Sequence, residues 1–255
     1  MSDLTALSKH TESILDSPFA WCFIPAGAVV LLDASDYGGT PGGTYHVSDF
    51  AIGGYLITNG QYKKFIEHPN GFRQTEWWSY SQQATQWRKD HPHPKPSAFP
   101  GSDLPSTRVS WFDSVAFCNW LSHELGAVIR LPTEQEWQRA AVGDTGWSYP
   151  WGNELDETRA NYASRLKQVS AVGSFPKGES PYGVSDMIGN LWEWCSTIWG
   201  TESTDLNGYV YRVFRGGAWN VSNPEYLRAL DRGEGHSPRG MLNDCGFRIV
   251  LELNQ

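Results

Sequence analysis

Cysteine is scarce in this sequence, and its positions are widely spaced. Only four of the 255 residues are cysteines, namely Cys22, Cys118, Cys195 and Cys245. No two of them have the CxxC spacing of a zinc knuckle, and four distant cysteines cannot form the dense disulfide framework of a small secreted domain. We therefore expect reduced thiols that pack as small apolar side chains.

Long apolar runs and an excess of positive charge are missing as well. No stretch approaches the run of about 18 apolar residues that a membrane-spanning helix needs, and residues 1–10 lack the charged and then apolar order of an export signal. The net charge of −8 disfavours general binding to nucleic-acid phosphates or anionic lipids. These absences predict a soluble, cytoplasmic protein with neither nucleic acid nor a membrane as its partner.

Aromatic residues, glycine and proline are abundant instead. The chain has 13 Trp, 11 Tyr and 11 Phe beside 26 Gly and 15 Pro. Each buried ring covers about 150–250 Å², so a few rings can fill a core whose backbone is mostly loop. Little regular secondary structure is expected, which disfavours a helical bundle or a Rossmann sheet with long periodic helices.

Capping patterns mark the helices that the sequence does predict. A capping residue is followed by apolar residues at helical spacing in three places, and one of these has the full Thr-x-x-Glu capping box. The caps are Asn59, Ser110 and Thr133, and the helices cover residues 60–66, 111–125 and 134–142.

Strand signals are shorter, and large parts of the chain have no period. β-branched and aromatic runs bounded by Gly, Pro or Asp predict strands at residues 21–24, 29–32, 48–52, 210–215 and 247–253. Residues 73–108 and 143–209 are expected to be loops. No repeat or charged linker divides the chain, so we expect an N-terminal segment, residues 1–20, followed by a single domain, residues 21–255.

Four motifs occur in a fixed order. They are IRLPTEQEW at 129–137, YPWGNE at 149–154, DMIGNLWEW at 186–194, and RGGAW at 215–219 with GFR at 246–248. In order and spacing these motifs resemble the sulfatase-modifying-factor family, to which the formylglycine-generating enzyme belongs. Residues 50–65 resemble that family's first helix, so the similarity covers about residues 21–252. The resemblance implies an α+β fold, in one C-type-lectin-like domain with low regular secondary structure and loops pinned by aromatic rings.

The family's copper chemistry is not expected here. In the formylglycine-generating enzyme a cysteine pair after the Gly-Gly motif binds copper, whereas residues 219–228 of this chain contain no cysteine. Soft thiolates select Cu(I), and Asn or Pro cannot replace them. Relatives that make ergothioneine hold iron through an HxxxHxE-like pattern, which none of the seven histidines matches. We therefore expect neither copper nor iron, and no formylglycine synthesis.

Calcium is the metal that the resemblance does imply. Two carboxylates with backbone carbonyls between them supply the oxygen ligands that Ca²⁺ prefers. The family's pattern corresponds here to the side chains of Asp186 and Glu193 and the carbonyls of Gly189 and Leu191. A second family site begins at a residue matching Asn161, but the loop that completes it is shortened here. A hydrogen-bonded loop without an ion is the alternative at the first site.

The C-terminal span from Trp219 to Cys245 is the candidate binding surface. Small and polar residues with a few rings make adaptable contacts on a rigid scaffold. The candidates are Asn220, Ser222, Tyr226, Asp231, His236, Asn243 and Asp244. The layout resembles the variable proteins of diversity-generating retroelements, which display a mutable surface before a GFR motif. This implies a protein or small-molecule ligand.

Two other interpretations stay open. A divergent enzyme of the same family would place its acid and base groups among Tyr226, Asp231, His236 and Asp244, and a scaffold domain would need none. Upstream, the tract from His91 to Pro94 carries two imidazoles that could begin a metal site, although a solvated proline-rich loop has the same composition.

Overall fold

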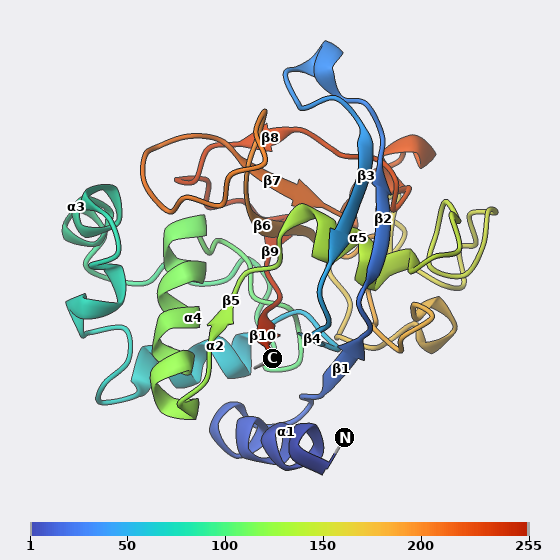
Figure 1. Cartoon of the computed structure of the whole chain (residues 1–255). Coiled ribbons are helices and arrows are strands. Elements are labelled where there is room, and N and C mark those ends of the chain that lie inside the picture. The colour runs from blue at the N-terminus through green and yellow to red at the C-terminus, as the bar shows by residue number, and fades with distance from the viewer. Residues whose placement is uncertain (1, 254–255) are drawn as a thin grey trace.

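The first and last strands of the chain lie in one sheet. The computed structural model describes residues 2–253, and its elements are shown in Figure 1. Strand β1 (Trp21–Ile24) pairs antiparallel with β4 (Phe50–Gly53), which also pairs with β10 (Val250–Glu252). Strand β5 (Ile129–Arg130) completes the order β1-β4-β10-β5. This sheet therefore joins β1 to β10, which lie more than 200 residues apart in the sequence.

A hairpin and a second four-stranded sheet complete the β-structure of residues 2–253. Strands β2 (Gly27–Leu31) and β3 (Gly43–Val47) form the hairpin, which projects from the molecule with η1 (Ser35–Tyr37) at its tip (Figure 1). The other sheet has the order β8-β7-β6-β9. Its strands are β8 (Gly235–His236), β7 (Arg212–Arg215), β6 (Trp192–Ile198) and β9 (Cys245–Gly246).

All three predicted helices are present. Helix α4 (Trp111–Leu125) begins after Ser110 and ends at Gly126, and α5 (Glu134–Val142) begins with the capping box of Thr133 and Glu136. Helix α2 (Asn59–Glu67) corrects one detail, because the capping side chain is Thr58, with Gln61 as its partner, and Asn59 is already the first helical residue. The Thr58 hydroxyl accepts from the Gln61 amide, which an Asn59 cap would leave unpaired.

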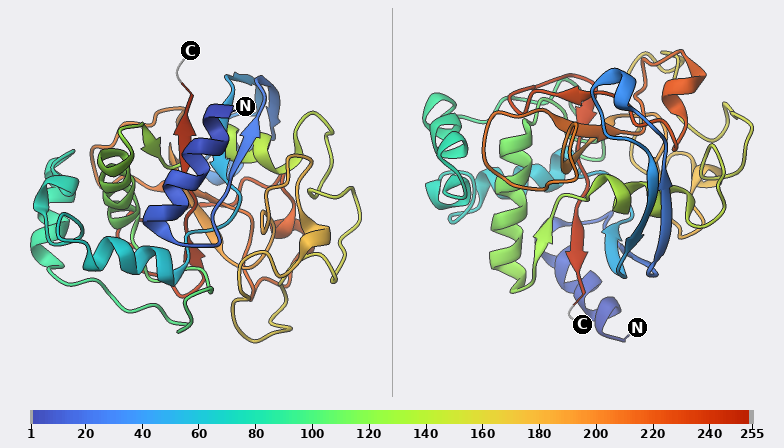
Figure 2. Two further views of the ribbon diagram at one scale, coloured as in Figure 1. Left: turned by 90° about the horizontal axis from the view of Figure 1, so that it is seen from below. Right: turned by 45° about the horizontal axis from the view of Figure 1, so that its top comes forward.

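Several elements lie where no periodic pattern predicted them. Helix α1 (Ser2–Leu15) occupies the N-terminal segment and runs across one end of the molecule, next to β1 (Figure 2). Helix α3 (Gln82–Asp90) and the 3-10 turn η2 (Thr75–Trp78) interrupt the expected loop 73–108. Strand β6 and η3 (Pro176–Gly178) lie within 143–209, and η4 (Pro224–Leu227) lies in the C-terminal span. The predicted strands at 48–52, 210–215 and 247–253 begin later, at Phe50, Arg212 and Val250.

Aromatic rings fill the core, as the composition predicted. Trp78, Trp111, Trp120, Trp137 and Trp194 are completely buried. The Phe65 ring packs on Trp78 and Trp120 at centroid distances of 5.8 and 5.3 Å. The four cysteines are free thiols, with Cys22 half-buried and the other three buried. Among the described residues, no helix is both long and apolar enough to cross a membrane.

Candidate functional site

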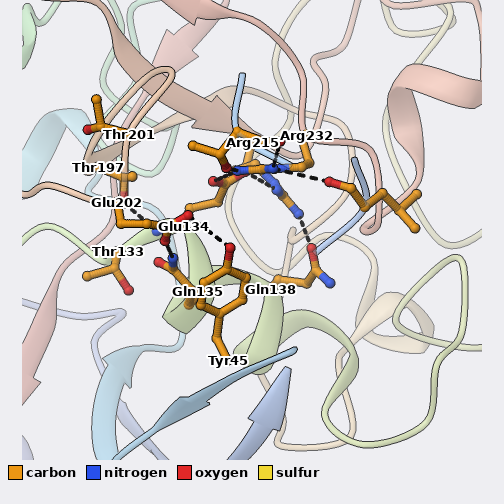
Figure 3. Close-up of polar contacts among 12 residues, drawn as sticks. Tyr45, Thr133, Glu134, Gln135, Gln138, Thr197, Thr201, Glu202, Arg215 and Arg232 are labelled. Atoms are coloured by element: carbon orange, nitrogen blue, oxygen red, sulfur yellow. Dashed lines mark hydrogen bonds and ion pairs between the residues drawn. The ribbon is translucent and has the colours of Figure 1, made fainter. Parts of the chain in front are cut away.

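A buried ion network joins the C-terminal span to α5 (Figure 3). The carboxylate of Glu134, on α5, accepts from the Arg215 guanidinium at 2.7 Å and from two nitrogens of Arg232 at 2.9 and 2.7 Å. Arg215 also donates to Gln138 Oε1 and to the Ala229 carbonyl, both at 2.6 Å. Because Glu134 and Arg215 have no exposed surface, the network fixes β7 and residues 229–232 against α5.

A second buried pair joins two of the sequence motifs. Glu193, from DMIGNLWEW, accepts from Arg248 of the GFR motif through both carboxylate oxygens at 2.6 Å. Trp137 Nε1 donates to the same carboxylate at 2.8 Å. None of the three side chains is exposed. Glu193 and Arg248 are 55 residues apart in the sequence, so only the fold reveals that they form a pair.

The contacts of Glu193 bear directly on the calcium prediction. A Ca²⁺ ion at Glu193 would compete with the Arg248 guanidinium for the same two oxygens, so this arrangement of side chains fits the ion poorly. Gly189 N donates to the Gly216 carbonyl, and Leu191 is buried in a small apolar cluster. Within residues 2–253 no group of three or more His, Cys, Asp or Glu side chains could hold a metal ion. Calcium binding stays a prediction.

Asp186 is the carboxylate of this motif that lacks a cationic partner in direct contact. It is 7% exposed, has a φ of 57°, and accepts from the Gly173 amide at 2.8 Å. Burial raises the pKa of Asp186 to about 6, and the negative charges of Glu193 and Glu179 add to the effect, against that of Arg248. A buried carboxylate in this state is stabilised by protonation.

The residues predicted to bind ligand fall into two groups by exposure. Asn220, Ser222, Tyr226 and Asn243 are exposed, whereas Asp231, His236 and Asp244 are half-buried. Asn220 donates to the Asp244 carboxylate at 3.1 Å, and the Asp244 carbonyl accepts from the Trp192 amide. These contacts bring Asn220 and Asp244 together at the end of β6.

Three further side chains border this surface and were not selected from the sequence. Arg108 donates to the Asn243 side chain at 2.7 Å. The half-buried rings of Trp192 and Phe214 meet edge to face at 4.8 Å, and the His236 ring lies 5.6 Å from Phe214. The WEW motif could have pointed to Trp192, but a tryptophan in an apolar motif indicates core packing first. Arg108 lies in a segment without any sequence signal.

The acid and base groups expected of an enzyme are not assembled into a hydrogen-bonded pair among the described residues. His236 Nδ1 contacts the Ser237 carbonyl, and the Asp231 carboxylate accepts from Gly233 N at 3.2 Å. Burial raises the pKa of Asp231, partly offset by Arg215. Each group is therefore satisfied locally by the backbone.

Fold and motifs together define an α+β domain of the formylglycine-generating-enzyme type. The family model described as the sulfatase-modifying factor enzyme 1-like domain matches residues 13–253, and the chain belongs to this family.

The sequence relatives of this chain include proteins described as enzymes and one described as inactive. The chain is 31% identical to "Hercynine oxygenase" of Mycobacterium tuberculosis over 245 residues, which is 82% of this chain and 54% of that protein. It is 29% identical to "Inactive C-alpha-formylglycine-generating enzyme 2" of Mus musculus, covering 91% of this chain and 85% of that protein. The chain thus spans about half the length of the hercynine oxygenases it matches.

Two similar solved structures cover nearly the whole fold. "Treponema denticola variable protein 1" superposes with a TM-score of 0.67 at 23% identity, covering 91% of this chain and 95% of that one. "PvdO from Pseudomonas aeruginosa" superposes with a TM-score of 0.66 at 22% identity, covering 91% and 93%. At these identities the likeness concerns the fold.

Proposed function

We propose that this chain is a ligand-binding protein whose C-terminal span, residues 219–245, forms the binding surface. The observation that carries the proposal is the contrast between this surface and its support. Asn220, Tyr226 and Asn243 are exposed, while Arg215 and Phe247, which flank the span, have no exposed surface. Side chains that touch solvent without filling the core can change at small folding cost, as a recognition surface requires.

The backbone beneath the surface is rigid for a definable reason. Gly217 has a φ of 75°, and a Cβ atom there would lie 2.6 Å from the Leu227 side chain. At this φ and this close approach glycine is the residue that fits without strain. The base of the loop therefore packs closely against η4.

The chemistry of the surface favours a ligand that makes polar contacts. Asparagine, serine and tyrosine offer both donors and acceptors with little side-chain entropy to lose. A protein or small-molecule ligand fits this composition. We further propose that the surface is of the kind diversified by retroelements, because most of the exposed residues are ones that an adenine-mutated Asn codon can produce; Glu225, Glu234 and Met241 would then be fixed.

Screening of an immobilised peptide and glycan library tests the binding proposal. The native chain is compared with the variant Asn220→Ala/Tyr226→Ala/Asn243→Ala, and Arg73→Ala serves as a control at an exposed position outside the surface. Ligands bound by the native chain and by Arg73→Ala, but lost by the triple variant, support the proposal. Ligands bound equally by all three would contradict it.

Sequencing the gene across its source population tests the diversification separately. Substitutions are expected at the codons for Asn220, Ser222, Tyr226 and Asn243, with Arg215 and Phe247 invariant. Identical codons in every copy would remove diversification and leave ligand binding standing.

A divergent enzyme is the second candidate, favoured by the match to the hercynine oxygenases over 82% of this chain. Metal analysis of the purified protein distinguishes the two candidates. Stoichiometric iron or copper would support the enzyme, whereas a metal-free protein that binds a ligand would support the binding surface.

A further inference from the structure

A pocket of about 300 Å³ lies beside the C-terminal surface and includes none of its seven predicted ligand-binding residues. Its lining combines three rings, a guanidinium, a carboxylate and a thioether. The residues are Trp87, Asp90, His91, Tyr209, Arg239 and Met241.

Two of the rings are held firmly in place. Trp87 is 4% exposed, and its Nε1 donates to the buried Asp113 carboxylate at 3.1 Å. The His91 ring stacks on Trp87 with a centroid distance of 3.6 Å and an interplanar angle of 19°. The first histidine of the His-Pro-His-Pro tract is thus part of an aromatic wall, while His93 is exposed.

The third ring positions the cation. Tyr209 packs edge to face on the buried Phe112 ring at 5.9 Å, and the Arg239 guanidinium lies 3.8 Å from the Tyr209 centroid. Stacking of this kind orients a guanidinium and leaves its in-plane donors free.

Arg239 is an uncompensated charge in this arrangement. Its guanidinium is exposed and has no hydrogen-bond or ion-pair partner in the part of the chain that the structure describes. The Asp90 carboxylate on the pocket lining accepts from Gln86 at 2.9 Å instead. A planar fork with free donors, beside fixed rings, matches a carboxylate attached to a planar ring.

We propose that this pocket binds a small aromatic carboxylate, whose ring packs against the His91 and Tyr209 rings, with Trp87 behind His91, and whose carboxylate accepts a bidentate pair from Arg239. Tyr209 also lines a neighbouring hollow of about 560 Å³ with Ser, Thr and Gln side chains and Lys89. Polar substituents of the ligand extend into that hollow. The pocket shares Arg239 and Met241 with the span 219–245 but none of the seven residues named there as ligand-binding, so the two proposals are tested by different variants.

Calorimetric titration with 2-naphthoate tests the pocket, with 2-naphthamide as the neutral isostere and cyclohexanecarboxylate as the non-planar acid. The naphthoate is expected to bind saturably and at least about tenfold more tightly than either comparison compound, since one loses the charge-assisted contact and the other the ring stacking. Arg239→Gln is expected to weaken naphthoate binding by about tenfold or more, and Tyr209→Leu to weaken it as well.

Matched variants separate the pocket from general effects. Arg73→Gln removes an exposed arginine elsewhere and is expected to leave naphthoate binding unchanged, and melting curves of all variants confirm that they fold. Binding that is unaffected by Arg239→Gln, equal affinity for the amide, or no saturable naphthoate binding at millimolar concentration would each overturn the proposal. The triple variant of the C-terminal surface should bind naphthoate normally.

Discussion

At the scale of single residues, two buried arginines orient the groups packed around them. Arg215 and Arg248 each face a carboxylate with no exposed surface. Taking two charges out of water costs several kcal/mol per ion, so such a pair adds little net stability, although removing one partner is strongly destabilising. What the pairs provide is geometry, because the donors of a planar guanidinium point in fixed directions and so orient the groups that accept from them.

Arg248→Met should therefore destabilise the protein far more than the lost packing of the arginine side chain alone would. Glu193 would keep only the Trp137 hydrogen bond and would carry an unpaired buried charge. The free energy of unfolding in urea should fall by about 3–5 kcal/mol. Lys63→Ala, which breaks the exposed ion pair with Glu67, should cost below about 1 kcal/mol. Similar losses for both variants would contradict this account.

Asp186 makes stability depend on pH. Its folded pKa of about 6 lies above the ordinary value of 3.8, so the folded chain binds the proton more tightly than the unfolded chain. This contribution is complete below about pH 4 and is lost as the pH rises through about 6, and it amounts to about 3 kcal/mol.

Comparison with Asp186→Asn isolates the contribution of Asp186 to the pH dependence of stability. Asn tolerates the positive φ and can still accept from Gly173 N. The stability difference, variant minus native, should grow between pH 4 and pH 7 in urea titrations. A difference independent of pH would refute the assignment.

Bound calcium would reverse the preference of the folded chain for protonated Asp186, because a cation favours the ionised carboxylate. If the ion binds, its stabilisation follows RT ln(1 + [Ca²⁺]/Kd), about 2.7 kcal/mol at a hundredfold excess over Kd. Chelator should then lower the melting temperature of the native chain and leave Asp186→Asn unchanged. If chelator has no effect on either protein, Arg248 and Trp137 satisfy Glu193 and the predicted site does not bind calcium.

At the scale of elements, what the sequence could predict was set by local signals. Ser110, Thr133 and Gly126 act within a few residues of themselves, so helices α4 and α5 could be located from their caps. Strand β6 could not, because its residues WEWCSTI alternate in no simple way and five of the seven are buried. Its pairing with both β7 and the distant β9 makes it a strand.

The candidate site shows the same division. Composition of the C-terminal span identified Asn220, Tyr226 and Asn243 as surface residues, and they are exposed. It could not show that Asp231 and His236 are half-buried and satisfied by local backbone groups, since that depends on contacts with Gly233 and Ser237.

Near its tip, the β2–β3 hairpin is tied down by Arg232 from the C-terminal span, while Gln138 and Arg139 of α5 hold β2 further along. Arg232 donates to the Leu32 and Thr40 carbonyls at 3.1 and 2.9 Å, and to Glu134. Arg232→Met should release the tip, so that amide hydrogen exchange in residues 31–43 quickens by at least about tenfold. Glu134 keeps its pair with Arg215, which should protect α5 from faster exchange.

The exposed arginine variant Arg239→Gln is the control for this measurement and should leave exchange at the tip unchanged. Slow exchange of the tip in Arg232→Met would show that the strand ladder between β2 and β3 holds the hairpin without Arg232.

At the scale of the whole molecule, the fold separates the residues that carry stability from those that face solvent. The rings of α4, α5 and β6 and the two arginine networks lie beneath the C-terminal span. Loops of low regularity are held because their backbones are tied to these groups. This separation can be measured without knowing the ligand.

The triple variant Asn220→Ala/Tyr226→Ala/Asn243→Ala should melt within a few degrees of the native chain, because exposed substitutions usually change stability by no more than about 0.5 kcal/mol each. Trp137→Ala, in the support, should cost about 3–5 kcal/mol, since it removes a completely buried ring and the donor to Glu193. Calorimetric melting of both variants gives the comparison. A triple variant that loses as much stability as Trp137→Ala would mean that the span itself supports the core, and the proposed binding surface would then not be free to vary.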